Sequence, residues 1–287
     1  MREILTSPRQ AEIAHDRRVK NIRLSILVSI LFVAFIYACA YFSSDSRITI
    51  NKIKITGTHI ISDFDVDSFI KGELSGKYLY LFARGNSMIY PKREIYNSLR
   101  EKYPSIEELS IYRGDRNTLH VDIKERSASY LYCGAQVPAD TEAVGDNCYF
   151  INTDGYIFDK APYFSGNIYF KYYAPIPDTV KVLGQYVFPQ DEFHNLARFV
   201  DEVTGIGLKP IYLTLDSDNT YSLYLNHTPT NTSPKIVFKK GDDLTLLLNN
   251  LTVAMQKPEF ANEINSKYAT LLYIDLRFKN KVLYKFQ

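Results

Sequence analysis

The sequence predicts an α+β protein in which one N-terminal transmembrane helix is followed by a β-α-α-β-β domain and then by a mixed, β-rich domain with two helices. Three observations lead to this prediction. Residues 24–42 form an apolar run without charge, residues 48–126 hold strand patterns around two helical patterns, and residues 127–287 are dominated by short strand patterns. Residues 1–23 remain as a short basic tail.

The apolar run Leu24–Phe42 is long enough to cross a bilayer, because its 19 residues rise about 1.5 Å each in a helix and the hydrocarbon layer is roughly 30 Å thick. Basic residues gather before the run, whereas residues 43–46 carry only Asp45, so we expect a cytoplasmic N-terminus and exported C-terminal domains. Two alternatives stay open, signal-peptide cleavage near Ala38-Cys39-Ala40 and lipid attachment at Cys39. The length of the run and of the tail favours an uncleaved anchor.

The composition is that of a folded protein, because 46% of the residues are hydrophobic. The net charge of +2 argues against a nucleic-acid surface, which would need clustered lysine and arginine. The 23 tyrosines favour strands, so we expect the exported part to be rich in sheet.

Two cysteines, Cys133 and Cys148, lie outside the membrane run. In an oxidising compartment they would most simply form a disulfide, and closing a loop of about 15 residues would contribute roughly 3 kcal/mol. A reduced pair is the alternative. A zinc site is not favoured, because no further ligands are near in the sequence.

The first domain is expected to begin with a strand within Ile48–Thr56, paired from about Lys52 because the apolar phase switches there. A helix should follow, capped by Ser62 with Asp65 and ended by Gly72. Next come an extended segment (Tyr78–Phe82) and a helix (91–103) that Pro91 opens and that stops before Pro104. The domain ends with two strands, Ile106–Tyr112 and Thr118–Glu125, joined by a turn at 114–117.

The second domain begins with a predicted hairpin, Cys148–Ile151 and Tyr156–Phe158, around the turn Asp154-Gly155. A helix is expected after Pro189, a three-stranded meander next, and a second helix that ends near Pro258. The meander strands are Ile211–Leu215, Tyr221–Asn226 and Lys235–Lys239, the second helix covers 244–255, and the closing strands are Leu271–Phe278 and Lys281–Phe286, joined by a tight turn at Lys279-Asn280.

No motif indicates catalysis, a metal site or a cofactor. Asp63, Asp65 and Asp67 alternate as in a calcium loop, but Ser68 stands where such a loop needs glycine. The five histidines are scattered, and no nucleophile elbow, phosphate-binding loop or zinc-protease motif occurs. We therefore expect a protein that is not an enzyme and uses no cofactor.

The last strand, Lys281–Phe286, is a candidate binding edge, because only Gln287 follows to cover it. An unpaired edge offers backbone N–H and C=O groups to an incoming strand. A capped or interior strand is the alternative.

The chain resembles the cell-division protein family FtsQ/DivIB. The similar pieces occur in the family's order: the basic tail, one membrane helix, INKIKITGTHIIS, YPSIEELSIYRGDRNTLHVDIKER, YFINTDGYIFD and LLYIDLRFKNKVLYKF. The first two soluble segments and Arg126 are similar to a POTRA domain (48–126) that leads into the family's β domain (127–287). The insertion Gly134–Asn147 and the loop His227–Ser233 depart from the family pattern.

This resemblance implies a non-enzymatic divisome scaffold, anchored in the cytoplasmic membrane at the division septum. It implies FtsB/DivIC-like and FtsL-like partners outside the membrane, with further divisome members binding the POTRA-like domain. The β domain would receive a partner strand at residues Arg277, Phe278, Lys281, Val282, Leu283, Tyr284, Lys285 and Phe286.

Two other classes of function remain as alternatives. A POTRA-bearing envelope or protein-export assembly component would be expected to carry tandem POTRA copies or a membrane barrel, and the sequence indicates one copy and a globular C-terminal part. An anchored hydrolase would need a deep pocket with perturbed carboxylates.

Overall fold

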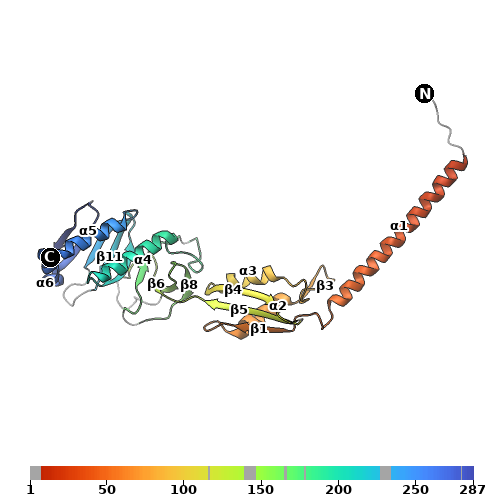
Figure 1. Ribbon diagram of the computed structural model, residues 1–287, viewed down its shortest axis with the longest axis horizontal. Coiled ribbons are helices and arrows are strands. Elements are labelled where there is room, and N and C mark those ends of the chain that lie inside the picture. Colours follow the sequence, from red (N-terminus) through yellow and green to blue (C-terminus); the bar gives the residue numbers. More distant parts are fainter. Residues whose placement is uncertain are drawn as a thin grey trace, which may run out of the picture. The chain divides into compact units, whose positions relative to one another are not determined.

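The computed structural model describes residues 8–115, 117–138, 147–164, 167–177, 179–226, 234–278 and 280–287, with side chains from Arg17 onward. The mixed α+β class is confirmed, with six α-helices in these ranges. The chain divides into two compact units (Figure 1), the described parts of 1–100 with Glu108–Glu125, and Glu101–Glu107 with Arg126–Gln287. Most of the insertion Gly134–Asn147, the loop His227–Ser233 and the turn residue Lys279 lie outside the described residues.

The N-terminal helix α1 (Pro8–Ser43) contains the predicted run Leu24–Phe42 and starts well before it. Its segment Arg17–Ser43 is long and apolar enough to cross a membrane. The large apolar side chains of this segment are mostly exposed, with Phe35 at 66%. A helix that is apolar all round and unburied by its own chain suits lipid better than water.

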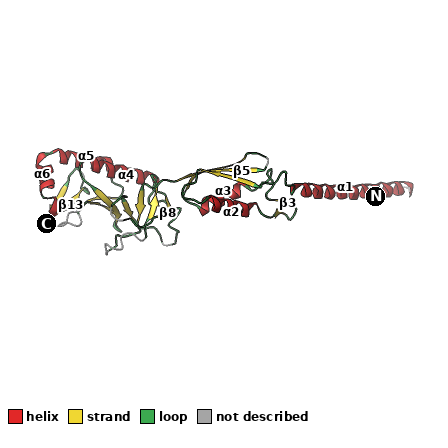
Figure 2. Cartoon of the chain, turned by 90° about the horizontal axis from the view of Figure 1, so that it is seen from below, coloured by secondary structure: helices red, strands yellow, loops and turns green. Residues whose placement is uncertain are grey.

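The first unit contains a three-stranded sheet with the order β1-β5-β4. Strand β1 (Lys52–Thr56) runs parallel to β5 (Thr118–Glu125), and pairing begins at Lys52 as predicted. Strand β4 covers Ile106–Arg113. Helices α2 (Asp63–Leu74) and α3 (Lys92–Lys102) lie on one side of the sheet (Figure 2). They bury the alternate apolar side chains of β5, as the period of two predicts.

Helix α2 begins after Ser62 as predicted, but the predicted capping box and the predicted C-terminal end were wrong. Ser62 is the N-cap residue, but its side chain makes no capping hydrogen bond. The carboxylate of Glu125, on β5, accepts the backbone N–H groups of residues 59–61 at 2.9–3.1 Å and so holds the turn that precedes the helix. The helix also continues through Gly72, and the left-handed glycine that follows it is Gly76 (φ +87°).

The single extended segment predicted at Tyr78–Phe82 was also wrong. The chain there forms a small hairpin of β2 (Lys77–Tyr78) and β3 (Phe82–Ala83). Its turn places Leu79 and Tyr80 in the left-handed region.

The second unit is built on a nine-stranded mixed sheet with the order β14-β13-β12-β11-β10-β9-β6-β7-β8. The predicted meander is confirmed, since β10, β11 and β12 are antiparallel neighbours. The short strands β6 and β9 were not predicted, because three residues show too little alternation. The strands are β6 (Tyr130–Tyr132), β7 (Tyr149–Ile151), β8 (Ile157–Lys160), β9 (Lys171–Tyr173), β10 (Pro210–Leu215), β11 (Thr220–Leu225), β12 (Lys235–Lys239), β13 (Leu271–Asp275) and β14 (Leu283–Phe286).

Three helices cover one side of this sheet (Figure 2), where the sequence predicted two. Helices α4 (Gln190–Gly205) and α5 (Leu244–Gln256) were expected. Helix α6 (Pro258–Ser266) was not, because Pro258 was interpreted as a stop for α5 although it is also the residue that opens α6. A 3₁₀ turn, Tyr268–Thr270, leads from α6 into β13.

The cysteines Cys133 and Cys148 form a disulfide with a Cα–Cα distance of 4.1 Å. They flank Tyr132 and Tyr149, which are directly paired across β6 and β7. The disulfide therefore ties the ends of the insertion to strands that the sheet already holds together.

Candidate partner-binding edge

The C-terminal strand β14 is an outer strand of the large sheet, and β13 is its neighbour in the sheet order. The two are antiparallel, with Ile274 opposite Tyr284 and Asp275 opposite Leu283. Both closing strands are shorter than predicted, because the backbone N–H groups of Arg277 and Lys281 bond within the connection, to Asp275 Oδ1 at 3.0 Å and to Phe278 O at 3.1 Å.

The hydrogen-bond pattern shows which side of β14 faces away from the sheet. The N–H of Gln287 donates to Thr270 O at 2.8 Å, so the backbone groups of residue 287 point towards β13. Because these groups alternate along an antiparallel strand, Leu283 and Lys285 also point towards β13. Tyr284 and Phe286 therefore direct their N–H and C=O groups outward.

One face of β14, which carries the side chains of Tyr284 and Phe286, packs against helix α6. The ring of Tyr284 meets that of Phe260 edge to face at 5.0 Å, and its hydroxyl donates to Glu263 Oε2 at 2.7 Å. Lys267 donates to the other oxygen of Glu263 at 2.8 Å and lies 5.4 Å above the ring of Phe286. These contacts fix the side chains of Tyr284 and Phe286, and within the described part of the chain no hydrogen bond engages the outward backbone groups of these two residues.

The charges in this cluster support one another. Hydrogen bonds from Lys267 and Tyr284 lower the pKa of Glu263 below its ordinary value. The hydrogen bond to Glu263 raises the pKa of the Tyr284 hydroxyl, so it stays a donor at neutral pH.

The opposite face of the edge carries Leu283 and Lys285, both exposed, and beside them a buried carboxylate, Asp275. The guanidinium of Arg277 donates two hydrogen bonds to the carboxylate of Asp275, Nε to Oδ1 at 2.9 Å and Nη2 to Oδ2 at 2.6 Å. Burial opposes ionisation of Asp275, but the bonds and charge of Arg277 outweigh it and hold the pKa of Asp275 below its ordinary value. Arg277 thus has an intramolecular role in keeping β13 and the following connection in place.

The remaining predicted residues lie in the connection between the strands. Phe278 is 51% exposed, Lys281 is exposed, and Val282 packs partly against the core. Asn280 takes the left-handed conformation of a tight turn (φ +59°). The edge therefore combines four strand residues with exposed groups of one turn.

Sequence reasoning missed the contribution of α6, namely Phe260, Glu263 and Lys267. The signal was present, because Glu263 and Lys267 have the i, i+4 spacing of a helical ion pair and follow a proline that can open a helix.

A groove of about 570 Å³ lies between α4 and the start of α5. Two of the acidic residues that line it have structural partners: Glu192 accepts from the Tyr221 hydroxyl, and Asp243 caps α5 through the N–H groups of Thr245 and Leu246. Among the described residues no group of three His, Cys, Asp or Glu side chains could hold a metal ion.

No protein-family model matches this chain, and a search of curated proteins gives no match.

Proposed function

We propose that this protein is a bitopic divisome scaffold of the FtsQ/DivIB type, which binds partner division proteins outside the cytoplasmic membrane during septum formation. The observation that carries the proposal is the edge strand β14, whose Tyr284 and Phe286 direct backbone donors and acceptors away from the sheet. An incoming strand satisfies these groups by β-augmentation.

The two faces of the edge define the partner segment. A partner side chain on the α6 side would meet the aromatic rings of Tyr284 and Phe286, which favours an apolar residue there. A side chain on the other side would lie near Leu283 and Lys285, and Lys281 adds a further positive charge. A short strand that alternates apolar residues with an acidic residue therefore fits best, and we assign it to an FtsB/DivIC-like protein acting together with an FtsL-like one.

The rest of the chain supports the same function. Helix α1 provides a membrane anchor by its length and composition. The β-α-α-β-β order of the first unit, with β1 parallel to β5, supports a POTRA-like domain that offers a second surface to other divisome members.

The test is a pull-down from cells with tagged full-length protein, read by mass spectrometry. Tyr284→Pro removes an outward N–H group, and Tyr284→Ala is the matched control, because it also loses the ring but keeps the N–H. We expect small division proteins with one membrane span to be recovered with wild type, in smaller amounts with Tyr284→Ala because the partner also contacts the ring, and at least tenfold less with Tyr284→Pro than with Tyr284→Ala. Leu283→Pro serves a different purpose, since it removes an N–H that faces β13 and should detach the strand itself.

A second variant keeps the test decisive if Tyr284→Pro disturbs folding. Lys285→Glu reverses an exposed charge and should weaken recovery of an acidic partner without changing the far-ultraviolet circular dichroism spectrum. Full recovery with Lys285→Glu, and with Tyr284→Pro where that variant folds, would refute the edge as the binding site. Recovery of export or outer-envelope proteins instead would point to the alternative class.

A further inference from the structure

The hairpin β2–β3 exposes large apolar side chains at its tip. Leu79 is 84% and Tyr80 is 95% exposed. The loop that follows the hairpin adds Met88, which is 76% exposed, and Ile89. These four residues form what we call the apolar tip.

The backbone of the apolar tip makes this exposure unusual. The N–H of Leu81 donates to Tyr78 O at 2.9 Å, and the two residues between them, Leu79 and Tyr80, have φ values of +48° and +61°. Both central positions of such a turn favour asparagine or glycine, because a Cβ is disfavoured there. The chain instead places a leucine and a tyrosine in this conformation, and neither is buried within the unit.

Hydrogen bonds fasten the hairpin to the end of α1. The backbone N–H of Ala83 donates to Ser43 Oγ at 3.3 Å, and the side-chain amide of Asn86 donates to Ser43 O at 3.2 Å. The N–H of Ile50 donates to Gly85 O at 2.8 Å, which holds the loop against the segment that leaves the helix.

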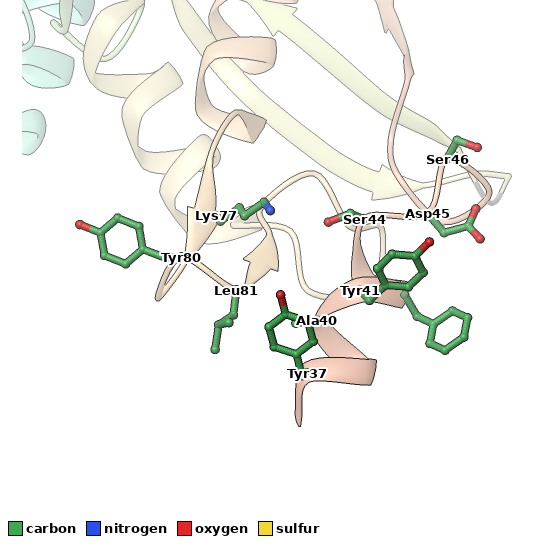
Figure 3. A pocket seen from close by; sticks show the side chains of 10 residues that line it. Tyr37, Ala40, Tyr41, Ser44, Asp45, Ser46, Lys77, Tyr80 and Leu81 are labelled. Carbon is green, nitrogen blue, oxygen red and sulfur yellow. The ribbon is translucent and has the colours of Figure 1, made fainter. Parts of the chain in front are cut away.

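This attachment places the hairpin beside the last two turns of α1. A cavity of about 520 Å³ is lined by Tyr37, Ala40 and Tyr41 from the helix and by Tyr80 and Leu81 from the hairpin (Figure 3). Tyr37 precedes the end of α1 by six residues, which corresponds to about 9 Å along the helix axis. A bilayer that surrounds these turns must also meet the hairpin.

From this placement we propose that the apolar tip inserts into the leaflet at the C-terminal end of α1, as a second membrane contact beside the helix. The ligand is phospholipid. Leu79 and Met88 would lie among the upper acyl chains, the Tyr80 phenol at the headgroup level, and the exposed ammonium group of Lys77 near the phosphates. The cavity then holds part of a lipid molecule. The proposal rests on α1 crossing a membrane and is independent of partner binding at β14.

Site-directed spin labelling of the full-length chain tests this contact. In a Cys39→Ala background with the disulfide intact, single nitroxides replace Tyr80 and Met88, and the protein is placed in nanodiscs of phosphatidylcholine and phosphatidylglycerol. Power saturation then compares access to oxygen, which concentrates in lipid, with access to a neutral, water-soluble nickel chelate.

Two reference positions complete the design. Phe64→Cys is the aqueous control, because Phe64 is 75% exposed but lies at the other end of α2 from the hairpin. Phe32→Cys reports the middle of the apolar run. We expect residues 80 and 88 to have a ratio of oxygen to nickel access that is several-fold higher than at residue 64 and lower than at residue 32, because they lie at the headgroup and upper acyl-chain level.

Three results would overturn the proposal. Residues 80 and 88 as open to nickel as residue 64 would place the apolar tip in water. Residues 80 and 88 closed to both reagents would mean that protein covers them. High nickel access at residue 32 would show that α1 does not cross the membrane, and the proposal depends on that crossing.

Discussion

Replacing Arg277 by alanine should loosen the C-terminal edge, because Asp275 would remain buried without its main partner. Asp275 is only 4% exposed, and the substitution removes both side-chain hydrogen bonds of Arg277, while the bond from the backbone N–H of residue 277 persists. The perturbation therefore leaves one hydrogen bond to a carboxylate that needs several.

The size of the effect follows from these two lost bonds. A hydrogen bond to a charged group contributes about 1.5–3 kcal/mol, and the 38% exposure of the Arg277 side chain lets water replace part of it. The loss of folding free energy also has an upper limit, because Asp275 can take up a proton instead of staying charged. Protonating a carboxyl with an unperturbed pKa of about 3.9 costs about 4 kcal/mol at pH 7, so the loss cannot exceed that amount. We expect a cost of about 2–3 kcal/mol, which corresponds to roughly 30- to 150-fold more frequent opening.

Amide hydrogen exchange of the full-length protein in detergent, read by mass spectrometry on peptides covering residues 271–287, measures this opening. The gap between wild type and variant should narrow as the pH falls from 7 to 4, after correction for intrinsic exchange. In wild type the pKa of Asp275 is lowered in the folded state, so the stability that it contributes is almost fully present over this range and is lost only below the unfolded pKa of about 3.9. In the variant burial alone should raise the pKa, so its folded state gains relative stability when Asp275 is protonated.

The matched control is the double variant Asp275→Asn with Arg277→Ala, which removes the buried charge together with its partner. It should exchange more slowly than Arg277→Ala alone. Exchange in Arg277→Ala within threefold of wild type at pH 7 would refute the structural role of the pair, and would return Arg277 to the set of residues free for partner binding.

Three further predictions concern the scaffold. Reducing the disulfide, or replacing Cys133 by serine, should lower the stability of the second unit by about 3 kcal/mol, seen as a lower denaturant midpoint; an unchanged midpoint would contradict the stabilising role. Gly155→Ala should cost about 3 kcal/mol in the same measurement, because its Cβ would lie 2.6 Å from the Phe193 ring at a φ of +81°, and a wild-type midpoint would show that the turn can relax. Leu79→Asn with Tyr80→Gly should raise the free energy of unfolding of the first unit by about 1–2 kcal/mol in detergent, measured as slower proteolysis. Faster proteolysis would show that these side chains stabilise the turn.

The sequence predicted which segment forms the candidate binding edge, but not which of its backbone groups point away from the sheet. The sequence predicted Lys281–Phe286 as a candidate binding edge, with a capped or interior strand as the alternative, and the structure places β14 at the outside of the sheet. Which residues point outward depends on pairing with β13, whose register contains an irregularity between Leu271 and Tyr273. A shift of one residue in the register between β13 and β14 would exchange the residues of β14 that point outward with those that point towards β13. The outward residues can therefore be identified only when the pairing with β13 is known.

The elements that the sequence determined by itself are those whose stabilising environment is local or uniform. The charge-free run Leu24–Phe42 forms a helix suited to lipid whatever the rest of the chain does, and the eight-residue alternation of Thr118–Glu125 predicts its strand with the observed bounds. Tertiary structure decided the features that depend on distant partners. Glu125 supplies the acceptor for the turn before α2, and the contacts of Phe260 and Glu263 with Tyr284 join α6 to the edge strand. A side chain separated in sequence from its partner leaves no periodic signal, so only the folded chain reveals such contacts.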